Sequence, residues 1–289
     1  MQSIDQLDVS GICGVLTDID DTLTEGGRLN ASTLNALHQL QQAGLKIVPV
    51  TGRSSGWGHM VMSTWPVDAV VAESGGCWFT RGHAGQVQLH LISEAAAQER
   101  KTLQTLCEQL VERNPPLRFA LDNQFRCVDV AIDFNENVTN CAYATITRVV
   151  NAIRAQGFNA RTSSIHINAW SGSFDKGPTA LALIKRTYPD LADVKKWVFI
   201  GDAPNDESMF GLFPNSVAVA NFLDTPPDSL AKMKHHPAYI TTGRFGNGFE
   251  QLAQQLEVGV NRAQATPLRP LLNKIHRVLK DEERTKKVP

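Results

Sequence analysis

The sequence lacks a hydrophobic run long enough to cross a membrane. Although 42% of its 289 residues are hydrophobic, none of the apolar runs approaches the roughly 20 residues that a transmembrane helix needs. Residues 1–11 contain no basic start followed by an apolar core, which argues against a secretory signal. We therefore expect a cytoplasmic protein without a membrane partner.

Cysteine and net charge are also scarce. The five cysteines are scattered, and none forms a CxxC pair or joins histidines at zinc spacing. This pattern is typical of reduced thiols in a cytoplasmic protein and excludes a disulfide framework. The formal net charge is −1, so no overall field attracts nucleic acid, and we expect no such partner.

Short apolar runs alternate with helical patterns through most of the chain, which is typical of an α/β protein with a parallel sheet. Each expected strand is apolar on both faces, as a central parallel strand is. The strands are expected at Cys13–Asp18, Lys46–Val50, Asp68–Ala72, Trp197–Gly201 and Ser216–Ala220, and helices near Ser32–Gln42, Pro178–Thr187, Asp206–Phe213 and Phe249–Leu256. The predicted fold class is a Rossmann-like parallel sheet flanked by helices.

The middle of the chain has a different pattern. From about residue 83 to residue 162 the order reads strand, helix, strand, strand, helix, strand. Apolar and polar residues alternate over Arg126–Phe134, a period of two that is typical of an antiparallel strand with one buried face. We expect an inserted α/β cap domain at 83–165, between two core parts at 1–82 and 166–260.

The C-terminal residues 261–289 are basic, with eight Arg and Lys against three Asp and Glu. Their leucines, isoleucine and valine recur at helical spacing. We interpret this tail as a helix that packs on the core or on a second subunit of a homodimer. A contact with nucleic acid or a membrane is the alternative.

Aspartates follow the first expected strand. The segment Leu16–Leu23 places Asp18, Asp20 and Thr22 where this strand ends. Ligands of open parallel sheets bind beyond the carboxyl ends of the strands. By itself this DxDxT pattern is weak evidence, because aspartates that form turns also produce it.

Three further segments place polar residues at the same edge of the sheet. Thr51 follows the second expected strand, Lys176 opens a helix, and the segment Gly201–Asp206 follows another strand. That segment contains Asp202, Asn205 and Asp206.

Two carboxylates about 4 Å apart repel by roughly 4 kcal/mol at an effective dielectric near 20. We expect Asp18, Asp20, Asp202 and Asp206 to converge on one crevice, which therefore needs compensation by a divalent cation and Lys176. Ligand sets made of oxygen alone favour Mg²⁺.

The four segments, in this order, resemble the motifs of the haloacid dehalogenase-like superfamily of phosphotransferases. The resemblance covers about residues 11–80 and 166–256. The position of the inserted domain resembles subclass IIB, which includes sugar-phosphate phosphatases and phosphomannomutases. The turn Glu73–Gly76 is similar to the Glu-Asn-Gly-Ala turn of that subclass, with Ser74 as a departure, and Asp21 replaces the usual glycine of the first motif.

The resemblance implies how the reaction would run. Asp18 would be the nucleophile that forms an aspartyl-phosphate. Asp20 would protonate the leaving oxygen and then activate the hydrolytic water. The Asp18 carboxylate, the Asp20 backbone carbonyl and Asp202 would hold Mg²⁺.

The same resemblance implies supporting roles. Thr51 would hydrogen-bond a phosphate oxygen, and Lys176 would neutralise charge on the nucleophile and the transferring group. Asn205 and Asp206 would orient the water ligands of the metal or Lys176. Ion-pumping relatives carry lysine in place of Asp20, so an aspartate there favours a hydrolase or a mutase.

Strand parity gives candidates for substrate binding in the cap. Ser164, His166 and Asn168 share one face of an expected strand, and Asp129 lies opposite the apolar face of its own strand. A polar sheet face above the crevice can hydrogen-bond sugar hydroxyls. Solvated strand residues would give the same pattern. Arg53 is a candidate for a phosphate contact or, equally, for a structural ion pair.

The sequence thus predicts a magnesium-dependent phosphatase that acts on a small phosphorylated metabolite, expected to be a sugar phosphate. Two alternatives stay open. A sugar phosphomutase would return the phosphoryl group to a sugar faster than water removes it. A non-catalytic regulatory binding protein would keep the fold without the reaction.

Overall fold

The computed structural model describes residues 1–163 and 165–265, so Ser164 and most of the expected basic tail lie outside it. The main sheet has six parallel strands in the order β1-β15-β14-β13-β2-β5. Their bounds are β1 (Gln2–Ser3), β2 (Gly14–Thr17), β5 (Lys46–Pro49), β13 (Trp197–Gly201), β14 (Asn215–Ala218) and β15 (Tyr239–Ile240). Four of the expected strands, β14, β13, β2 and β5, are thus neighbours in this sheet, and the two short strands β15 and β1 extend it beyond β14.

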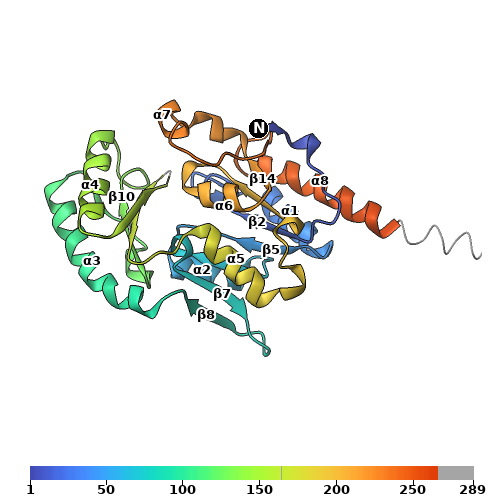
Figure 1. Ribbon diagram of the computed structural model, residues 1–289, viewed down its shortest axis with the longest axis horizontal. Coiled ribbons are helices and arrows are strands. Elements are labelled where there is room, and N and C mark those ends of the chain that lie inside the picture. Colours follow the sequence, from blue (N-terminus) through green and yellow to red (C-terminus); the bar gives the residue numbers. More distant parts are fainter. Residues whose placement is uncertain (164, 266–289) are drawn as a thin grey trace, which may run out of the picture.

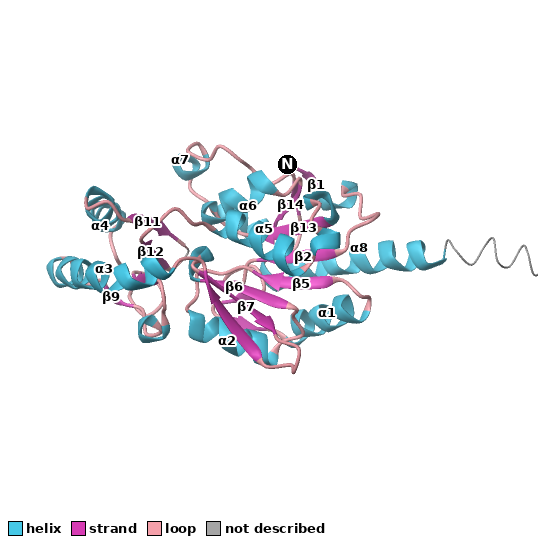
Figure 2. Cartoon of the chain, turned by 60° about the horizontal axis from the view of Figure 1, so that its bottom comes forward, coloured by secondary structure: helices cyan, strands magenta, loops and turns pink. Residues whose placement is uncertain are grey.

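Helices cover both faces of this sheet (Figure 2). They are α1 (Ala31–Gln42), α2 (Ser55–Thr64), α5 (Lys176–Thr187), α6 (Glu207–Leu212), α7 (Pro227–Leu230) and α8 (Phe245–Ala265). Val15 and Ile47 share a buried cluster with α1 and α8, whereas Leu16 and Val48 share one with α5 and α6. Because successive strand residues face opposite sides, each strand is apolar on both. The predicted fold class is confirmed.

No helix in the described part of the chain combines the length and the hydropathy of a membrane span. The longest helix of the core, α8, reaches Ala265, well beyond the expected end at Leu256. The rest of the predicted basic tail falls outside the described residues.

A sheet of three antiparallel strands continues from the main sheet. Its strands are β6 (Ala69–Ala72), β7 (Cys77–Arg81) and β8 (Val87–Leu91), and a separate hairpin contains β3 (Thr24–Glu25) and β4 (Arg28–Leu29). A parallel bridge between Val50 and Val71 links β6 to the chain that follows β5. The strand expected at Asp68–Ala72 therefore exists, but its ladder is the antiparallel one with β7.

The cap is a four-stranded antiparallel sheet in the order β11-β12-β10-β9, with two helices on one face (Figure 1). Its elements are α3 (Glu94–Arg113), β9 (Arg118–Phe119), β10 (Asp129–Asp133), α4 (Tyr143–Ala155), β11 (Asn159–Thr162) and β12 (His166–Trp170). Leu103 of α3 and Ile153 of α4 share a buried cluster with Val130, Ile132 and Ile167 of the sheet. The helices thus cover one sheet face, and the other is left for the core.

The strand pairing differs from the expected domain boundaries. The sequence places β8 in the cap, but β8 pairs with β7. It places β12 in the core, but β12 pairs with β10 and β11. A boundary drawn from the order of elements misses this, because hydrogen-bonded partners decide to which sheet a strand belongs. We therefore propose residues 94–171 as the cap, in place of 83–165.

Candidate active site

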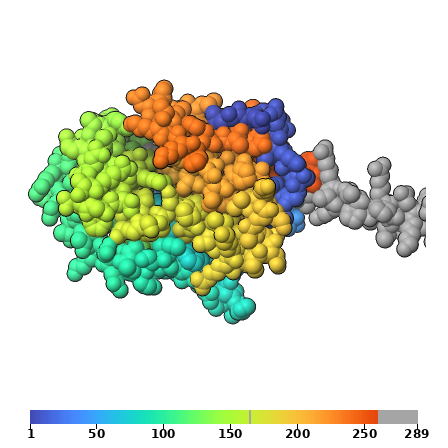
Figure 3. Space-filling view, in the orientation of Figure 1, coloured from blue at the N-terminus to red at the C-terminus, as the bar shows by residue number. Residues whose placement is uncertain are grey.

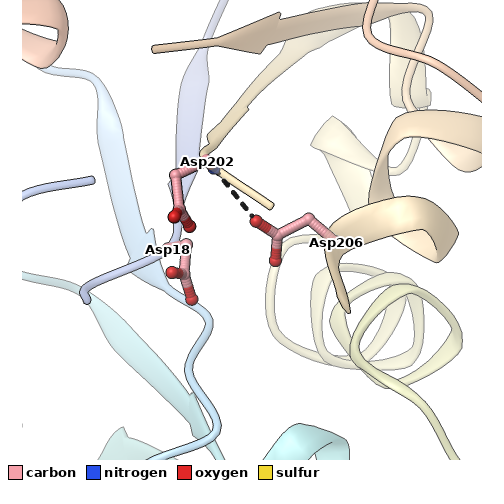
Figure 4. Close-up of side chains that lie close together, drawn as sticks. All are labelled: Asp18, Asp202 and Asp206. Atoms are coloured by element: carbon pink, nitrogen blue, oxygen red, sulfur yellow. Dashed lines mark hydrogen bonds between the residues drawn. The ribbon is translucent and has the colours of Figure 1, made fainter. Parts of the chain in front are cut away.

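Three buried aspartates lie together at the carboxyl edge of the main sheet (Figure 4). Asp18 follows β2, and its backbone N–H donates a hydrogen bond to the carbonyl of Ile200 in β13 at 2.9 Å. Asp202 follows β13, and Asp206 ends the short turn Pro204–Asp206. One carboxylate oxygen from each aspartate lies within 4.8 Å of the other two. Adjacent parallel strands therefore bring distant segments of the chain to one point.

Lys176 reaches this cluster from the first residue of α5. Its Nζ lies 2.7 Å from Oδ1 of Asp18 and 2.7 Å from Oδ1 of Asp206, and its side chain is buried. Burial alone lowers the pKa of Lys176, but the charges of Asp18 and Asp206 outweigh burial and raise the pKa. Lys176 is therefore held as a cation between two carboxylates.

The turn at Glu73–Gly75 supports the start of α5. Gly75 has a φ of +102°, and a Cβ there would lie 2.5 Å from the carbonyl oxygen of Asp175, so the position requires glycine. The Gly75 carbonyl accepts a hydrogen bond from Oγ1 of Thr179 at 2.9 Å. Asp175 caps the helix by accepting from the N–H of Lys176 at 2.7 Å. The turn thus fixes the backbone that carries Lys176.

The buried cluster carries excess negative charge. Desolvation raises the pKa of Asp18 to about 8, against the opposing charge of Lys176. Burial, followed by the charges of Asp18 and Asp206, raises the pKa of Asp202. When all are ionised, three carboxylates and one ammonium sum to −2. A divalent cation among the carboxylate oxygens would balance this charge.

Asn205 adds to the fit between these residues and a metal ion. Its Oδ1 is buried and has no hydrogen-bond partner among the described residues, and Asn205 lines the same cavity as Asp18 and Asp202. A buried polar atom is costly unless it has a partner such as an ion or a water molecule. The donors are all oxygen, which is the preference of Mg²⁺.

Asp206 has both carboxylate oxygens engaged. Oδ1 accepts from Lys176, and Oδ2 accepts from the backbone N–H of Asp202 at 3.2 Å. These contacts suit the expected role of orienting Lys176. They also hold the backbone of Asp202 in place beside Asp18 (Figure 4).

Asp20 does not extend its side chain into the aspartate cluster. It instead accepts a bidentate contact from Arg53, with Nε at 3.0 and 2.9 Å from the two carboxylate oxygens and Nη2 at 2.7 Å from Oδ1. Arg53 is buried, and its guanidinium also lies over the ring of Trp57 at 5.1 Å. Of the two expectations for Arg53, the structure therefore contains the ion pair. Asp21, which follows Asp20, has a φ of +56°. This left-handed conformation favours glycine, the residue that the resembling motif usually has at this position.

Arg53 also connects the core to the cap. Its Nη1 lies 2.6 Å from Oε1 of Glu136, and Oε2 of Glu136 lies 2.9 Å from Nε2 of His166. The hydrogen bond with His166, followed by the charge of Arg53, lowers the pKa of Glu136 to about 2 despite partial burial. A continuous chain of polar contacts thus runs from Asp20 to the cap sheet. Glu136 lies in the loop after β10, where no sequence pattern singled it out.

Thr51 is fully buried, and its Oγ1 accepts a hydrogen bond from the N–H of Arg53 at 3.0 Å. The carbonyl of the intervening Gly52 accepts from Nη1 of Arg126 at 3.0 Å and from Nδ2 of Asn168 at 3.2 Å. The loop after β5 is therefore held from both sides, by its own threonine and by the cap.

The cap candidates are not solvated strand residues. Asp129, His166 and Asn168 are all buried. His166 and Asn168 line the cavity that contains Asp18 and Asp20. Asp129 does not line it and instead pairs with Arg126 at 2.8 Å, while burial raises the pKa of Asp129 to about 7 against the opposing charge of Arg126.

Glu73 has a role that the sequence did not indicate. Its buried carboxylate accepts four backbone N–H groups at 2.7–3.1 Å, from Ser55 and from Cys127, Val128 and Asp129. It thereby ties the start of α2 to the cap strand. The resemblance of its turn to a family motif was the one available signal.

The cap closes over the candidate site, and the space-filling view shows cap and core in direct contact (Figure 3). The cavity at Asp18 has a volume of about 10 Å³, which is room for roughly one water molecule. A larger open groove of about 650 Å³ adjoins it at Asp202, between Tyr143 of the cap and Arg244 of the core. The enclosed cavity is lined by Asp18, Asp20, Gly52, Arg53, Ser163, Ile165, His166, Asn168, Asp202 and Asn205.

A family model described as haloacid dehalogenase-like hydrolase matches residues 15–123 and 91–225. The chain belongs to this family. The expected membership is thereby confirmed, and with it the prediction of a hydrolase-family enzyme. A comparison with curated protein sequences finds no match.

Several solved structures share the fold. A Thermoplasma acidophilum protein has a TM-score of 0.66 and 18% identity, over 85% of this chain and 98% of that one. The sucrose-phosphatase from Synechocystis, solved with sucrose and phosphate, has a TM-score of 0.60 and 13% identity, over 85% and 98%. A phosphatase from Bacteroides thetaiotaomicron has a TM-score of 0.57 and 21% identity, over 87% and 97%.

Proposed function

We propose that this enzyme is a magnesium-dependent phosphatase that hydrolyses a small phosphorylated metabolite, a sugar phosphate, through an aspartyl-phosphate on Asp18. The observation that carries the proposal is the buried pair of Asp18 and Lys176 beside Asp202 and Asp206. A structural role alone would not require three buried carboxylates around one lysine, because such a cluster is costly without a ligand. The set favours catalysis over a non-catalytic binding role.

The residues divide the reaction into two transfers. In the first, a carboxylate oxygen of Asp18 bonds to phosphorus as the bond to the leaving oxygen breaks, and Asp20 donates a proton to that oxygen. In the second, Asp20 takes a proton from water, whose oxygen bonds to phosphorus and releases Asp18. Bound Mg²⁺, held by Asp18, the Asp20 carbonyl and Asp202, would offset charge between nucleophile and phosphate.

Other side chains stabilise the transferring group. The ammonium of Lys176, 2.7 Å from Asp18, would balance charge on the phosphoryl oxygens. The hydroxyl of Thr51 would donate a hydrogen bond to one of these oxygens, since its Oγ1 already accepts a hydrogen bond from the N–H of Arg53.

The substrate class is proposed from the cap. His166 and Asn168 bring imidazole and amide groups to the cavity, and such groups can hydrogen-bond sugar hydroxyls. Two proteins of similar fold are a sucrose-phosphatase and a protein related to trehalose-6-phosphate phosphatase. We extend the sugar-phosphate class to this chain on these grounds.

Turnover of p-nitrophenyl phosphate tests the proposed activity. It should vanish with excess chelator and return with Mg²⁺. Asp18→Asn should lower it at least about 10³-fold because the amide is a poor nucleophile, whereas Asp228→Asn, at an exposed aspartate of α7, should leave it unchanged. Full turnover in Asp18→Asn or in excess chelator would refute the mechanism.

A further inference from the structure

Four charged or polar side chains form one continuous chain of contacts across the junction of core and cap. Asp20 pairs with Arg53, Arg53 with Glu136, and Glu136 with His166, at 2.6–3.0 Å. The first two residues belong to the core and the last two to the cap. We propose that Glu136 is a positioning residue, which acts through Arg53 to fix the carboxyl group of Asp20 for proton transfer. This inference rests on the proposed function.

The contact between Arg53 and Asp20 fixes both the distance and the plane of the carboxyl group. A guanidinium that contacts both oxygens of a carboxylate holds its plane, whereas a single contact leaves it free to rotate. Arg53 is 6% exposed, so its other end needs a partner as well. Glu136 is that partner, and without it Arg53 would keep Asp20 and the ring of Trp57 but lose the contact that holds Nη1.

Glu136 is itself held in place from two directions. Asp133, at the end of β10, is fully buried. Its carboxylate accepts the backbone N–H groups of residues 135, 136 and 137 at 2.8–3.0 Å, which fixes the loop that carries Glu136. His166, 2% exposed on β12, then contacts Oε2 of Glu136 at 2.9 Å. Such support is expected of a residue whose position matters.

Several other contacts between cap and core end on the backbone of the loop after β5, and the ion pair of Arg161 with Asp175 does not involve Asp20. Arg126 and Asn168 bind the carbonyl of Gly52, and Asp122 accepts from the N–H of Ser54 at 3.2 Å. These contacts hold the loop but do not reach a reacting group. Glu136 contacts a side chain that reaches the proposed proton donor, so closing the cap places Glu136 where it can set the geometry of Asp20.

Two substrates with different leaving groups can distinguish a misplaced Asp20 from a general loss of activity. Phenyl phosphate and p-nitrophenyl phosphate have the same shape around phosphorus, but phenolate is the poorer leaving group and gains more from a proton donor. The value of kcat/KM covers the first transfer to Asp18 and not the later hydrolysis. The ratio of the two kcat/KM values is also independent of the folded fraction, because both come from one preparation.

The test compares Glu136→Gln with the wild type and with Glu112→Gln, an exposed glutamate on the cap helix α3. Glu136→Gln should lower kcat/KM about 10-fold for phenyl phosphate and less than about 3-fold for p-nitrophenyl phosphate, a fraction of the 10²–10⁴ typical of a proton donor. Asp20→Asn and Arg53→Lys should shift the ratio in the same direction, and Glu112→Gln should not shift it.

The outcomes separate this inference from the proposed function. Equal losses on both esters, or no loss on either, in Glu136→Gln would overturn the positioning role while wild-type turnover keeps the phosphatase. A wild type that hydrolyses neither ester would overturn both.

Discussion

Replacing Asp202 with asparagine should stabilise the metal-free protein and remove its response to Mg²⁺. Burial raises the pKa of Asp18 to about 8 and also raises that of Asp202, so the repulsion is largest in alkaline buffer, where these groups ionise. Asp202 then lies within 4.8 Å of two other carboxylates, Asp18 and Asp206, and Lys176 contacts those two. At 4.8 Å and an effective dielectric of 20, each like-charge pair costs about 3.5 kcal/mol. With one pair cancelled by Lys176, about 3.5 kcal/mol of repulsion remains for the substitution to relieve.

This relief should be measurable as a rise in Tm. For a chain of this size, 1 kcal/mol corresponds to about 2 °C, so Asp202→Asn in alkaline buffer with chelator should melt about 7 °C above the wild type. Asparagine preserves the shape and can donate a hydrogen bond to a neighbouring carboxylate. In Mg²⁺ at 100 times its Kd, the wild type should gain about 2.7 kcal/mol, and the variant should gain almost none.

Thermal melts with and without Mg²⁺ supply the measurement, and Asp228→Asn is the matched control because Asp228 is exposed. A variant that melts below the wild type in chelator would contradict the repulsion. A variant with the wild-type gain in Mg²⁺ would show that Asp202 is not a ligand.

Three further substitutions test other parts of the structure. Glu73→Gln replaces one of two oxygens that receive backbone N–H groups, so urea unfolding should show a loss of about 2–5 kcal/mol from two unpaired donors. Lys176→Met should cost roughly 3 kcal/mol in the same assay and lower turnover at least about 10²-fold, whereas the exposed Lys185→Met on α5 should do neither. The pKa of Glu136 is lowered to about 2, so its stabilisation is present above pH of about 4.5 and is lost as pH falls. Glu136→Gln should therefore lose less stability than the wild type between pH 5 and pH 3.

The sequence best predicted the site residues whose positions follow from the direction of the adjoining strand or helix. Asp18, Asp202 and Lys176 each stand directly at the end of a strand or the start of a helix, and parallel strands must end at the same edge. Their convergence therefore follows from topology once the strands are recognised. The same reasoning could not find Glu136, because its position depends on how a loop of the cap meets a loop of the core.

Strand parity was right about which cap residues share a face and wrong about their surroundings. Asp129 reads as part of the polar side of a half-buried strand, yet it is fully buried, as is Asp133 on the same side. Asp129 pairs with Arg126, and Asp133 binds the backbone of the next loop. A period of two reports that two faces differ in polarity, but it cannot distinguish water from a second domain as the neighbour of the polar face.

The aspartates near the site are neutralised by two different side-chain cations, whereas the sequence suggested Lys176 alone besides a metal ion. One lysine and one metal ion would have to balance four carboxylates if Asp20 joined the cluster. Arg53 instead binds the Asp20 carboxylate, so Lys176 has three carboxylates to share with a divalent ion, and the charges can sum to zero. Lys176 and Arg53 thus serve different chemical tasks. Lys176 balances negative charge on the proposed nucleophile, whereas Arg53 holds the carboxylate of the proposed proton donor outside the aspartate cluster. Because Arg53 in turn contacts Glu136 of the cap, the separation of these tasks depends on both domains being in contact.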